Sequence, residues 1–98
     1  MTLKEILQEC QPSKVVGSMD RTIQAVEIDS RKASAGTLFI AMRGTQTDGH
    51  SYIGKAIAQG ASAIVCETMP EDVNPDVTYL VYENTEAVAG PLATAFYR

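Results

Sequence analysis

The stretch from Glu27 to Gly60, EIDSRKASAGTLFIAMRGTQTDGHSYIGKAIAQG, predicts a strand, a loop, a second strand, a glycine-bracketed loop and a helix. Residues 38–42 (LFIAM) form an apolar run of strand length, and a loop bracketed by Gly44 and Gly49 follows at once. Apolar residues then recur at helical spacing, at Tyr52, Ile53, Ala56 and Ile57. Gly60 stands where residue C′ of that helix is expected. A glycine-rich turn that leads into a helix suits an anionic ligand such as a phosphate, because it presents unpaired N–H groups and a positive dipole end.

The same loop nearly matches a P-loop, G-x-x-x-x-G-K-[ST], but His50 takes the place of the lysine. Without that lysine the loop has no fixed positive charge for a β- or γ-phosphate, so we do not expect it to hydrolyse ATP. Binding of a diphosphate or a sugar nucleotide through backbone and side-chain donors stays open. The alternative is a turn whose glycines serve only the turn, and a pattern this short favours that alternative.

Size, charge and cysteine content narrow the class of protein. The chain has 98 residues, which suits one domain, and its net charge of −4 argues against nonspecific binding to nucleic acid or to an anionic membrane. Cys10 and Cys66 have no metal-ligand spacing and are expected to be reduced core thiols. There is no pattern of a signal peptide and no apolar run of membrane-spanning length, so we expect a soluble cytoplasmic protein.

The remaining elements alternate between strands and helices. A capping box, Thr2-x-x-Glu5, predicts a first helix that ends before Pro12. Further strands are expected at 15–16, 25–29, 38–42, 61–66 and 78–82, and further helices at 51–59 and 83–97. In the strand at 25–29, Val26 and Ile28 are expected to face one side. Pro91 falls within the last helical pattern and predicts a kink there or a helix that begins near it.

This alternation predicts an α/β fold, a small mixed sheet flanked by helices. The strands at 25–29 and 38–42 are expected to pair in antiparallel fashion, because Gly36 and its neighbours make a connection too short for a helical crossover. Gly36 is expected to adopt a positive φ. Residues 69–76 contain two prolines and three acids, which is typical of an exposed loop.

Several polar residues near the two loops could serve a site or order the backbone. Asp29 ends a strand and is expected to cap a turn, with Arg31 pairing with it or with Asp48. Asp48 precedes a helix and reads as its N-cap. His50 is the only histidine, and a hydrogen-bonded structural role is favoured over that of a base, because no serine or cysteine nucleophile is evidently paired with it.

Four motifs at fixed spacing resemble the N-terminal domain of Mur ligases, the ATP-dependent enzymes that build the peptidoglycan stem peptide. They are D-S-R at 29–31, G-x-L-F-I-A at 36–41, G-x-Q-x-D-G-H at 44–50 and A-I-x-x-G-A-x-A at 56–63. Their order is most similar to the members that add the third residue to UDP-N-acetylmuramoyl-L-alanyl-D-glutamate. The members that add D-alanyl-D-alanine are an alternative, although they more often read D-T-R. An alternative of another class is a non-catalytic small-molecule-sensing or interaction module on a similar fold.

The resemblance implies that residues 1–98 are a UDP-sugar-binding domain of the Mur ligase N-terminal type, without the ATP-binding and C-terminal domains. The residues it implicates in contact with the UDP-sugar are Ile28, Ser30, Thr45, Gln46 and Thr47. The residues expected to support them are Asp29, Arg31, Asp48, Gly49 and His50. ATP and Mg²⁺ are expected only in the full-length ligase, where this domain would pack against its own central domain. The isolated chain is therefore expected to be inactive and to contain no catalytic residue and no metal site.

Overall fold

Five short strands form one sheet in the order β1-β5-β4-β3-β2. The computed structural model of the protein describes residues 1–43 and 48–97. The strands are β1 (Lys14–Val16), β2 (Ala25–Glu27), β3 (Thr37–Ile40), β4 (Ala63–Cys66) and β5 (Thr78–Val81). The α-helices are α1 (Leu3–Ile6), α2 (Ile53–Ala58) and α3 (Thr85–Tyr97). Short 3₁₀ turns are η1 (Leu7–Glu9), η2 (Ser30–Lys32) and η3 (Gly49–Tyr52).

The sheet is mixed, as expected, but the antiparallel pair is not the expected one. β2 pairs with β3 in parallel, and β3, β4 and β5 continue in parallel, whereas β1 pairs antiparallel with β5. The prediction of an antiparallel β2–β3 pair was wrong because it assumed that a parallel return needs a full helix. β3 has only four residues, about 13 Å of strand, so residues 28–36 with the single turn η2 bring the chain back.

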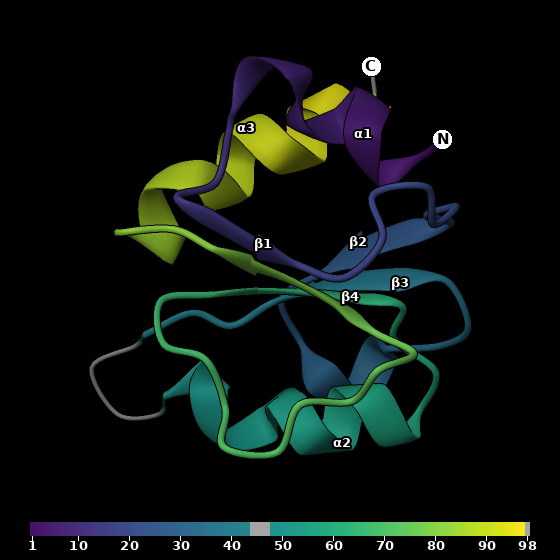
Figure 1. The fold of residues 1–98 in the computed structure, drawn as a ribbon, viewed down its shortest axis with the longest axis vertical. Helices are drawn as coiled ribbons and strands as arrows, with labels where there is room; N and C mark the ends of the chain where they lie inside the picture. Colours follow the sequence, from purple (N-terminus) through teal and green to yellow (C-terminus); the bar gives the residue numbers. More distant parts are fainter. Residues whose placement is uncertain (44–47, 98) are drawn as a thin grey trace.

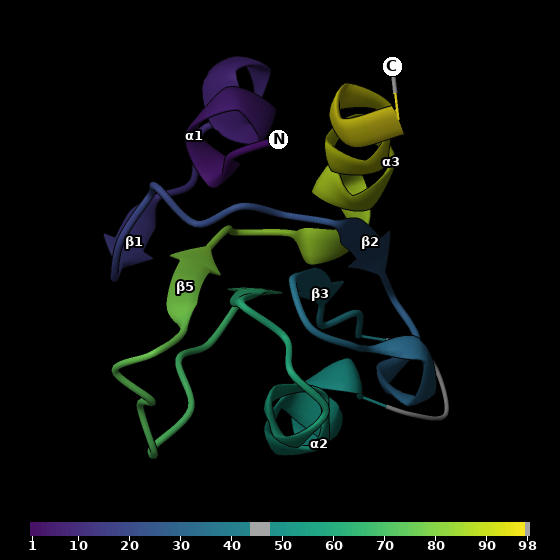
Figure 2. The ribbon, with the colours of Figure 1, turned by 90° about the vertical axis from the view of Figure 1, so that its right-hand side faces the viewer.

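Helices cover both faces of the sheet, so the core has two layers. Figure 2 shows α1 and α3 on one face and α2 on the other. Successive strand residues alternate between the layers: Leu38 and Ile40 of β3 pack with α1 and α3, whereas Phe39 packs on the side of α2. All four residues of β3 and of β4 are buried. Strands covered on both faces read as continuous apolar runs, which is why these two were recognisable from the sequence.

Several element boundaries differ from the expected ones. β2 ends at Glu27, so Ile28, which was expected on the same side of the strand as Val26, lies beyond the strand and is 60% exposed. The N-terminal part of the expected helix 51–59 is the 3₁₀ turn η3. α3 runs from Thr85 through Pro91 to Tyr97, so the alternative of a helix that begins near Pro91 was wrong.

The predicted helix cap and the predicted turn glycines are confirmed. Thr2 and Glu5 form the capping box at α1, and Gly36 and Gly60 have φ of 82° and 111°. Both cysteines are free thiols, but only Cys66 is buried, and Cys10 is half-buried. Burial raises the pKa of the Cys66 thiol to about 11.

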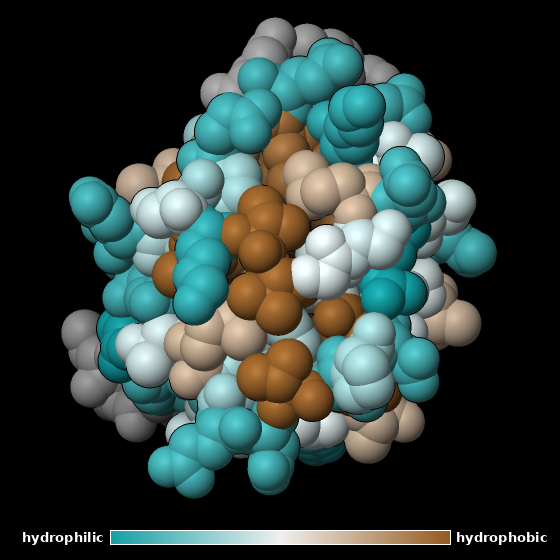
Figure 3. All heavy atoms as spheres, viewed as in Figure 1, coloured by the Kyte–Doolittle hydropathy of each residue, from teal (hydrophilic) through white to brown (hydrophobic). Residues whose placement is uncertain are grey.

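Apolar side chains are also exposed on one face of the molecule. Figure 3, in the orientation of Figure 1, shows apolar side chains in a band across the face where the edge strand β1 and β5 lie. Within the part of the chain that the structure describes, no helix has the length and apolarity needed to cross a membrane.

Candidate functional site

The site lies where parallel strands end. Because β2, β3 and β4 run in the same direction, the residues that follow them meet at one edge of the sheet. Asp29 and Ser30 follow β2, and Met42 follows β3. The antiparallel pairing expected from the sequence would have placed these two connections at opposite edges, so the parallel β2–β3 pair is what creates the site.

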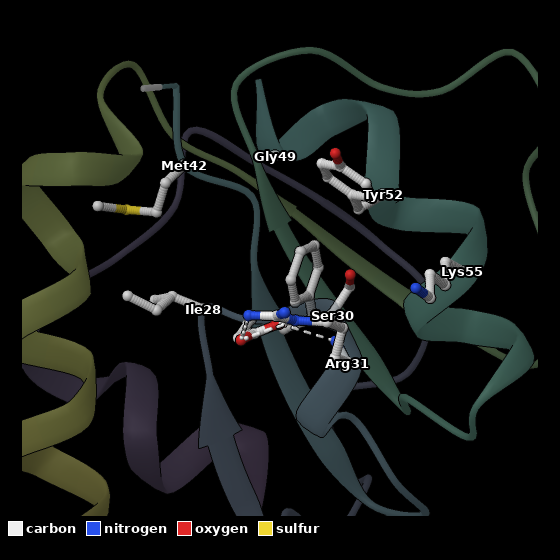
Figure 4. A pocket seen from close by; sticks show the side chains of 9 residues that line it. Ile28, Ser30, Arg31, Met42, Gly49, Tyr52 and Lys55 are labelled. Carbon is white, nitrogen blue, oxygen red and sulfur yellow. Dashed lines mark hydrogen bonds and ion pairs between the residues drawn. The ribbon is translucent and has the colours of Figure 1, made fainter. Parts of the chain in front are cut away.

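A pocket of about 550 Å³ opens at this edge. Its lining combines apolar and polar side chains: Ile28, Asp29, Ser30, Arg31, Phe39, Met42, Gly49, Tyr52 and Lys55. In Figure 4 the side chains of Ile28 and Met42 lie on one side of the pocket, Tyr52 and Lys55 on the other, and Ser30 between them. Phe39 is 1% exposed, whereas Tyr52 is 40% exposed. Apolar walls with a few polar groups are typical of a small-molecule site.

Asp29 and Arg31 form a self-contained pair at the rim. The Asp29 side chain caps η2 by accepting a hydrogen bond from the Arg31 backbone N–H at 2.9 Å. The Arg31 guanidinium pairs with the same carboxylate, with Nε 3.0 Å from Oδ1 and Nη2 2.8 Å from Oδ2. The hydrogen bonds from the guanidinium and then from the backbone hold the pKa of Asp29 at about 2. The expected Asp29–Arg31 pairing is therefore confirmed, and the alternative partner for Arg31, Asp48, is not used.

Ser30 is held against α2. Ser30 is buried within η2, and its backbone carbonyl accepts a hydrogen bond from the side-chain amide of Gln59. This bond fixes the end of α2 against η2, which places the helix beside the pocket. Within residues 1–43 and 48–97 the Ser30 hydroxyl has no hydrogen-bond partner, so it is available to a ligand.

A second polar cluster lies at the same edge of the sheet, next to the start of α3. Arg43 places Nη1 2.9 Å from Asp48 Oδ2 and Nε 2.8 Å from Glu67 Oε1. Glu67 in turn accepts a hydrogen bond at 3.0 Å from the backbone N–H of Thr85, the first residue of α3. This bond is the main cause that lowers the pKa of Glu67. The cluster ties the ends of β3 and β4 to the start of α3.

His50 is part of the same cluster. Its Nε2 accepts a hydrogen bond at 2.9 Å from the backbone N–H of Glu67, so the ring proton is on Nδ1, 2.8 Å from Asp48 Oδ1. Both ring nitrogens are engaged, which confirms the structural role expected for His50. The position that a P-loop fills with lysine therefore offers no group to a phosphate.

The backbone at the start of η3, the turn that leads into α2, is also engaged. The N–H of Gly49 donates to the Met42 carbonyl at 2.6 Å. The N–H groups of His50 and Ser51 donate to Asp48, at 2.9 Å to Oδ1 and 3.0 Å to the backbone oxygen. The N–H groups of residues 49–51 are therefore not free for an anion, because Asp48 accepts from two of them and Met42 from the third. The rest of the predicted loop, residues 44–47, lies outside the described residues.

The structure brings only part of the predicted site together. Five of the predicted residues line the pocket: Ile28, Asp29, Ser30, Arg31 and Gly49. Asp48 and His50 belong instead to the Arg43–Glu67 cluster. Thr45, Gln46 and Thr47 lie outside the described residues.

Four lining residues were missed by the sequence analysis: Phe39, Met42, Tyr52 and Lys55. Phe39 and Met42 were assigned to an apolar strand, and Tyr52 to the apolar stripe of a helix. The sequence signal that could have pointed to Lys55 was its position four residues before Gln59, which places both side chains on the same helical face.

The arrangement is suited to binding. Among residues 1–43 and 48–97 no three His, Cys, Asp or Glu side chains are grouped so that they could hold a metal ion. The one histidine is engaged through both ring nitrogens. The pocket offers three things to a ligand. Its apolar surface suits a ring, the Ser30 hydroxyl suits a polar group, and the Lys55 ammonium suits an anionic group.

Comparison with known proteins gives consistent matches. The sequence profile described as Mur ligase family, catalytic domain, matches residues 22–97. The UDP-N-acetylmuramoyl-L-alanyl-D-glutamate–2,6-diaminopimelate ligases of Bacteroides fragilis and Bacteroides thetaiotaomicron are each 50% identical over 97 residues, which is 99% of this chain. A crystal structure of MurF from Acinetobacter baumannii superposes on 96% of this chain with a TM-score of 0.80 at 24% identity, a likeness of fold. The chain spans 20% of the length of each of these proteins.

Proposed function

Because the chain belongs to the Mur ligase family, we propose that it is the domain that binds the UDP end of UDP-N-acetylmuramoyl-L-alanyl-D-glutamate in a ligase adding the third residue of the peptidoglycan stem peptide. The two Bacteroides relatives carry that substrate in their names. The motif order that distinguishes this branch of the family from the D-alanyl-D-alanine-adding branch favours the same assignment.

The observation that carries the proposal is the pocket at the ends of β2 and β3. It joins the D-S-R residues Asp29, Ser30 and Arg31 to apolar walls in a space of about 550 Å³. A uracil ring has a flat apolar face and polar edges, and such a pocket meets both needs. Ser30 supplies a hydroxyl, and Ile28 supplies exposed apolar surface. Thr45, Gln46 and Thr47 complete the proposed set of ligand contacts.

The amide-forming chemistry belongs to other parts of the full-length ligase. Among the described residues, His50 stands at the P-loop lysine position with both ring nitrogens engaged, which supports placing ATP outside this domain. ATP and Mg²⁺ are accordingly proposed for the central domain, against which this domain packs. The role of the present chain is to hold the nucleotide end of the substrate so that its peptide end reaches that centre. This role implies the cytoplasm as the compartment of the protein.

The test is a titration of the isotope-labelled chain with UDP and UDP-N-acetylmuramic acid, followed by NMR chemical shifts. We expect weak binding, because only the UDP end of the ligand meets this domain, with shifts at Ile28, Ser30 and Tyr52. Replacing Ser30 and Gln46 together by alanine should weaken binding by roughly 1–3 kcal/mol if each makes one hydrogen bond to the ligand. ADP serves as the control nucleotide.

Two results would contradict the proposal. Shifts confined to residues 69–76, with Ser30 silent, would place the ligand elsewhere on the domain. Equal affinity for UDP and ADP would favour the alternative of a general small-molecule-sensing module, since a sensor need not prefer uridine nucleotides.

A further inference from the structure

The charges that line the pocket do not cancel. Asp29 and Arg31 neutralise each other through their two-point pair. Lys55 is the third charged residue of the lining, and within residues 1–43 and 48–97 its ammonium group makes no ion pair. The lining therefore carries one uncompensated positive charge, on a protein whose net charge is −4.

The position of Lys55 is fixed by the helix that carries it. Gln59, one turn further along the same helical face, is hydrogen-bonded to the Ser30 carbonyl. This anchor turns the face with Lys55 toward η2 and the pocket. Figure 4 shows the ammonium end of Lys55 directed toward the Ser30 side of the pocket. Ser30 offers a hydroxyl donor on that side, so a lysine ammonium and a hydroxyl face the same space.

Among the described residues, the backbone N–H groups at the start of η3 are already engaged. The N–H groups of Gly49, His50 and Ser51 are all bonded within the protein. Among the described lining residues, Lys55 is the charged side chain that pairs with no opposite charge, so it is the one that we expect an anionic ligand to meet. A compact ammonium on a flexible stem contacts phosphate well as a point charge.

We propose that Lys55 is a specificity-determining residue that contacts the diphosphate of the nucleotide ligand, next to the Ser30 hydroxyl. This inference rests on the proposed function, since it assigns one part of the uridine nucleotide to one side of the pocket. Tyr52 and Ile28 then provide the apolar surface for the uridine. The pocket discriminates UDP from the neutral nucleoside through Lys55.

The experiment compares the wild-type chain with Lys55→Gln, Lys55→Arg and Lys4→Gln, each titrated with UDP and with uridine and followed by NMR shifts. Lys4→Gln is the matched control, because Lys4 is an exposed residue of α1 on the opposite face of the sheet. We expect Lys55→Gln to weaken UDP binding about fivefold and to leave uridine binding unchanged. Lys55→Arg should restore most of the UDP affinity, and Lys4→Gln should have no effect.

Salt gives a second readout. UDP binding by the wild-type chain should weaken between 20 mM and 200 mM NaCl, about the range over which screening of an exposed charge pair becomes strong, and this dependence should be smaller in Lys55→Gln. Wild-type binding of UDP with no change in Lys55→Gln would overturn the inference alone. An equal loss of UDP and uridine would also overturn it, because Lys55 would then act through packing. A wild-type chain that binds neither uridine ligand would overturn the proposed function as well.

Discussion

At the scale of single residues, Asp29 and Asp48 are each held by a neighbour two positions away. Asp29 caps η2 and Asp48 caps η3, in each case by accepting the N–H two residues further on. Such local bonds follow from residue type and spacing, so both caps could be read from the sequence. The same bonds engage these aspartates in ordering loops, so the proposed ligand contacts are assigned to Ser30 and Lys55.

The Asp29–Arg31 pair makes a residue-scale prediction about pH. The guanidinium holds the pKa of Asp29 at about 2, below its ordinary value of 3.8. Because the folded-state pKa is depressed, the pair stabilises the fold fully above pH 3.8, and this contribution is lost as the pH falls through about 2. In Arg31→Gln the pKa of Asp29 should rise toward 3.8, as measured by an NMR titration of its carboxyl carbon. Lys14→Gln, on the far edge strand, should leave it unchanged, and an Asp29 that still titrates near 2 in Arg31→Gln would contradict the assigned cause.

At the scale of elements, short pieces of structure are joined by specific bonds between their ends. α2 has only six residues, too few to be stable alone. It is continued backward by η3, tied to η2 through Gln59, and ended by Gly60. The pocket wall that carries Tyr52 and Lys55 therefore depends on how this helix begins and ends.

Two glycines of this helix region should respond oppositely to alanine. Gly60 has a φ of 111°, and a Cβ added there would lie 2.8 Å from the backbone nitrogen of Ala35, so Gly60→Ala should destabilise the fold by about 1–3 kcal/mol. Gly54 lies in α2, and a Cβ there meets nothing within 4 Å. Gly54→Ala should stabilise the fold by up to about 1 kcal/mol, since alanine favours helix. Urea unfolding of both variants measures the difference. A Gly60→Ala variant as stable as the wild-type chain would contradict the role given to Gly60.

At the scale of the whole molecule, the domain has a core of two layers, one on each face of the sheet. The apolar residues on both faces of the sheet give a domain of 98 residues enough buried surface to fold with modest stability. The pocket lies at the edge of the sheet where β2 and β3 end. This architecture supports the proposed role of a substrate-binding domain.

The purified chain should accordingly fold cooperatively and show no ATP turnover. We expect no turnover because His50, which stands in place of the P-loop lysine, is bonded through both ring nitrogens. Circular dichroism with urea measures folding, and phosphate release measures turnover. An ATP turnover that disappears in His50→Ala would contradict this prediction, whereas the same turnover in both proteins would identify a contaminating ATPase.

The sequence by itself determined the features that depend on near neighbours. The buried strands β3 and β4, the capping box at Thr2 and the positive φ of Gly36 and Gly60 all follow from local periodicity or from the conformational range of one residue. The family motifs also lie in short segments, so the resemblance and the prediction that Ser30 contacts the ligand needed no coordinates. These signals span a few residues and need no knowledge of what packs where.

Only the tertiary structure decided which segments meet. The parallel pairing of β2 with β3 brings the ends of both strands to one edge, and nothing within either strand specifies its partner. The exposure of Ile28 and the place of Lys55 beside Ser30 follow from that pairing and from the Gln59 anchor. Contacts between residues tens of positions apart depend on how the whole core packs, and local patterns leave that packing open.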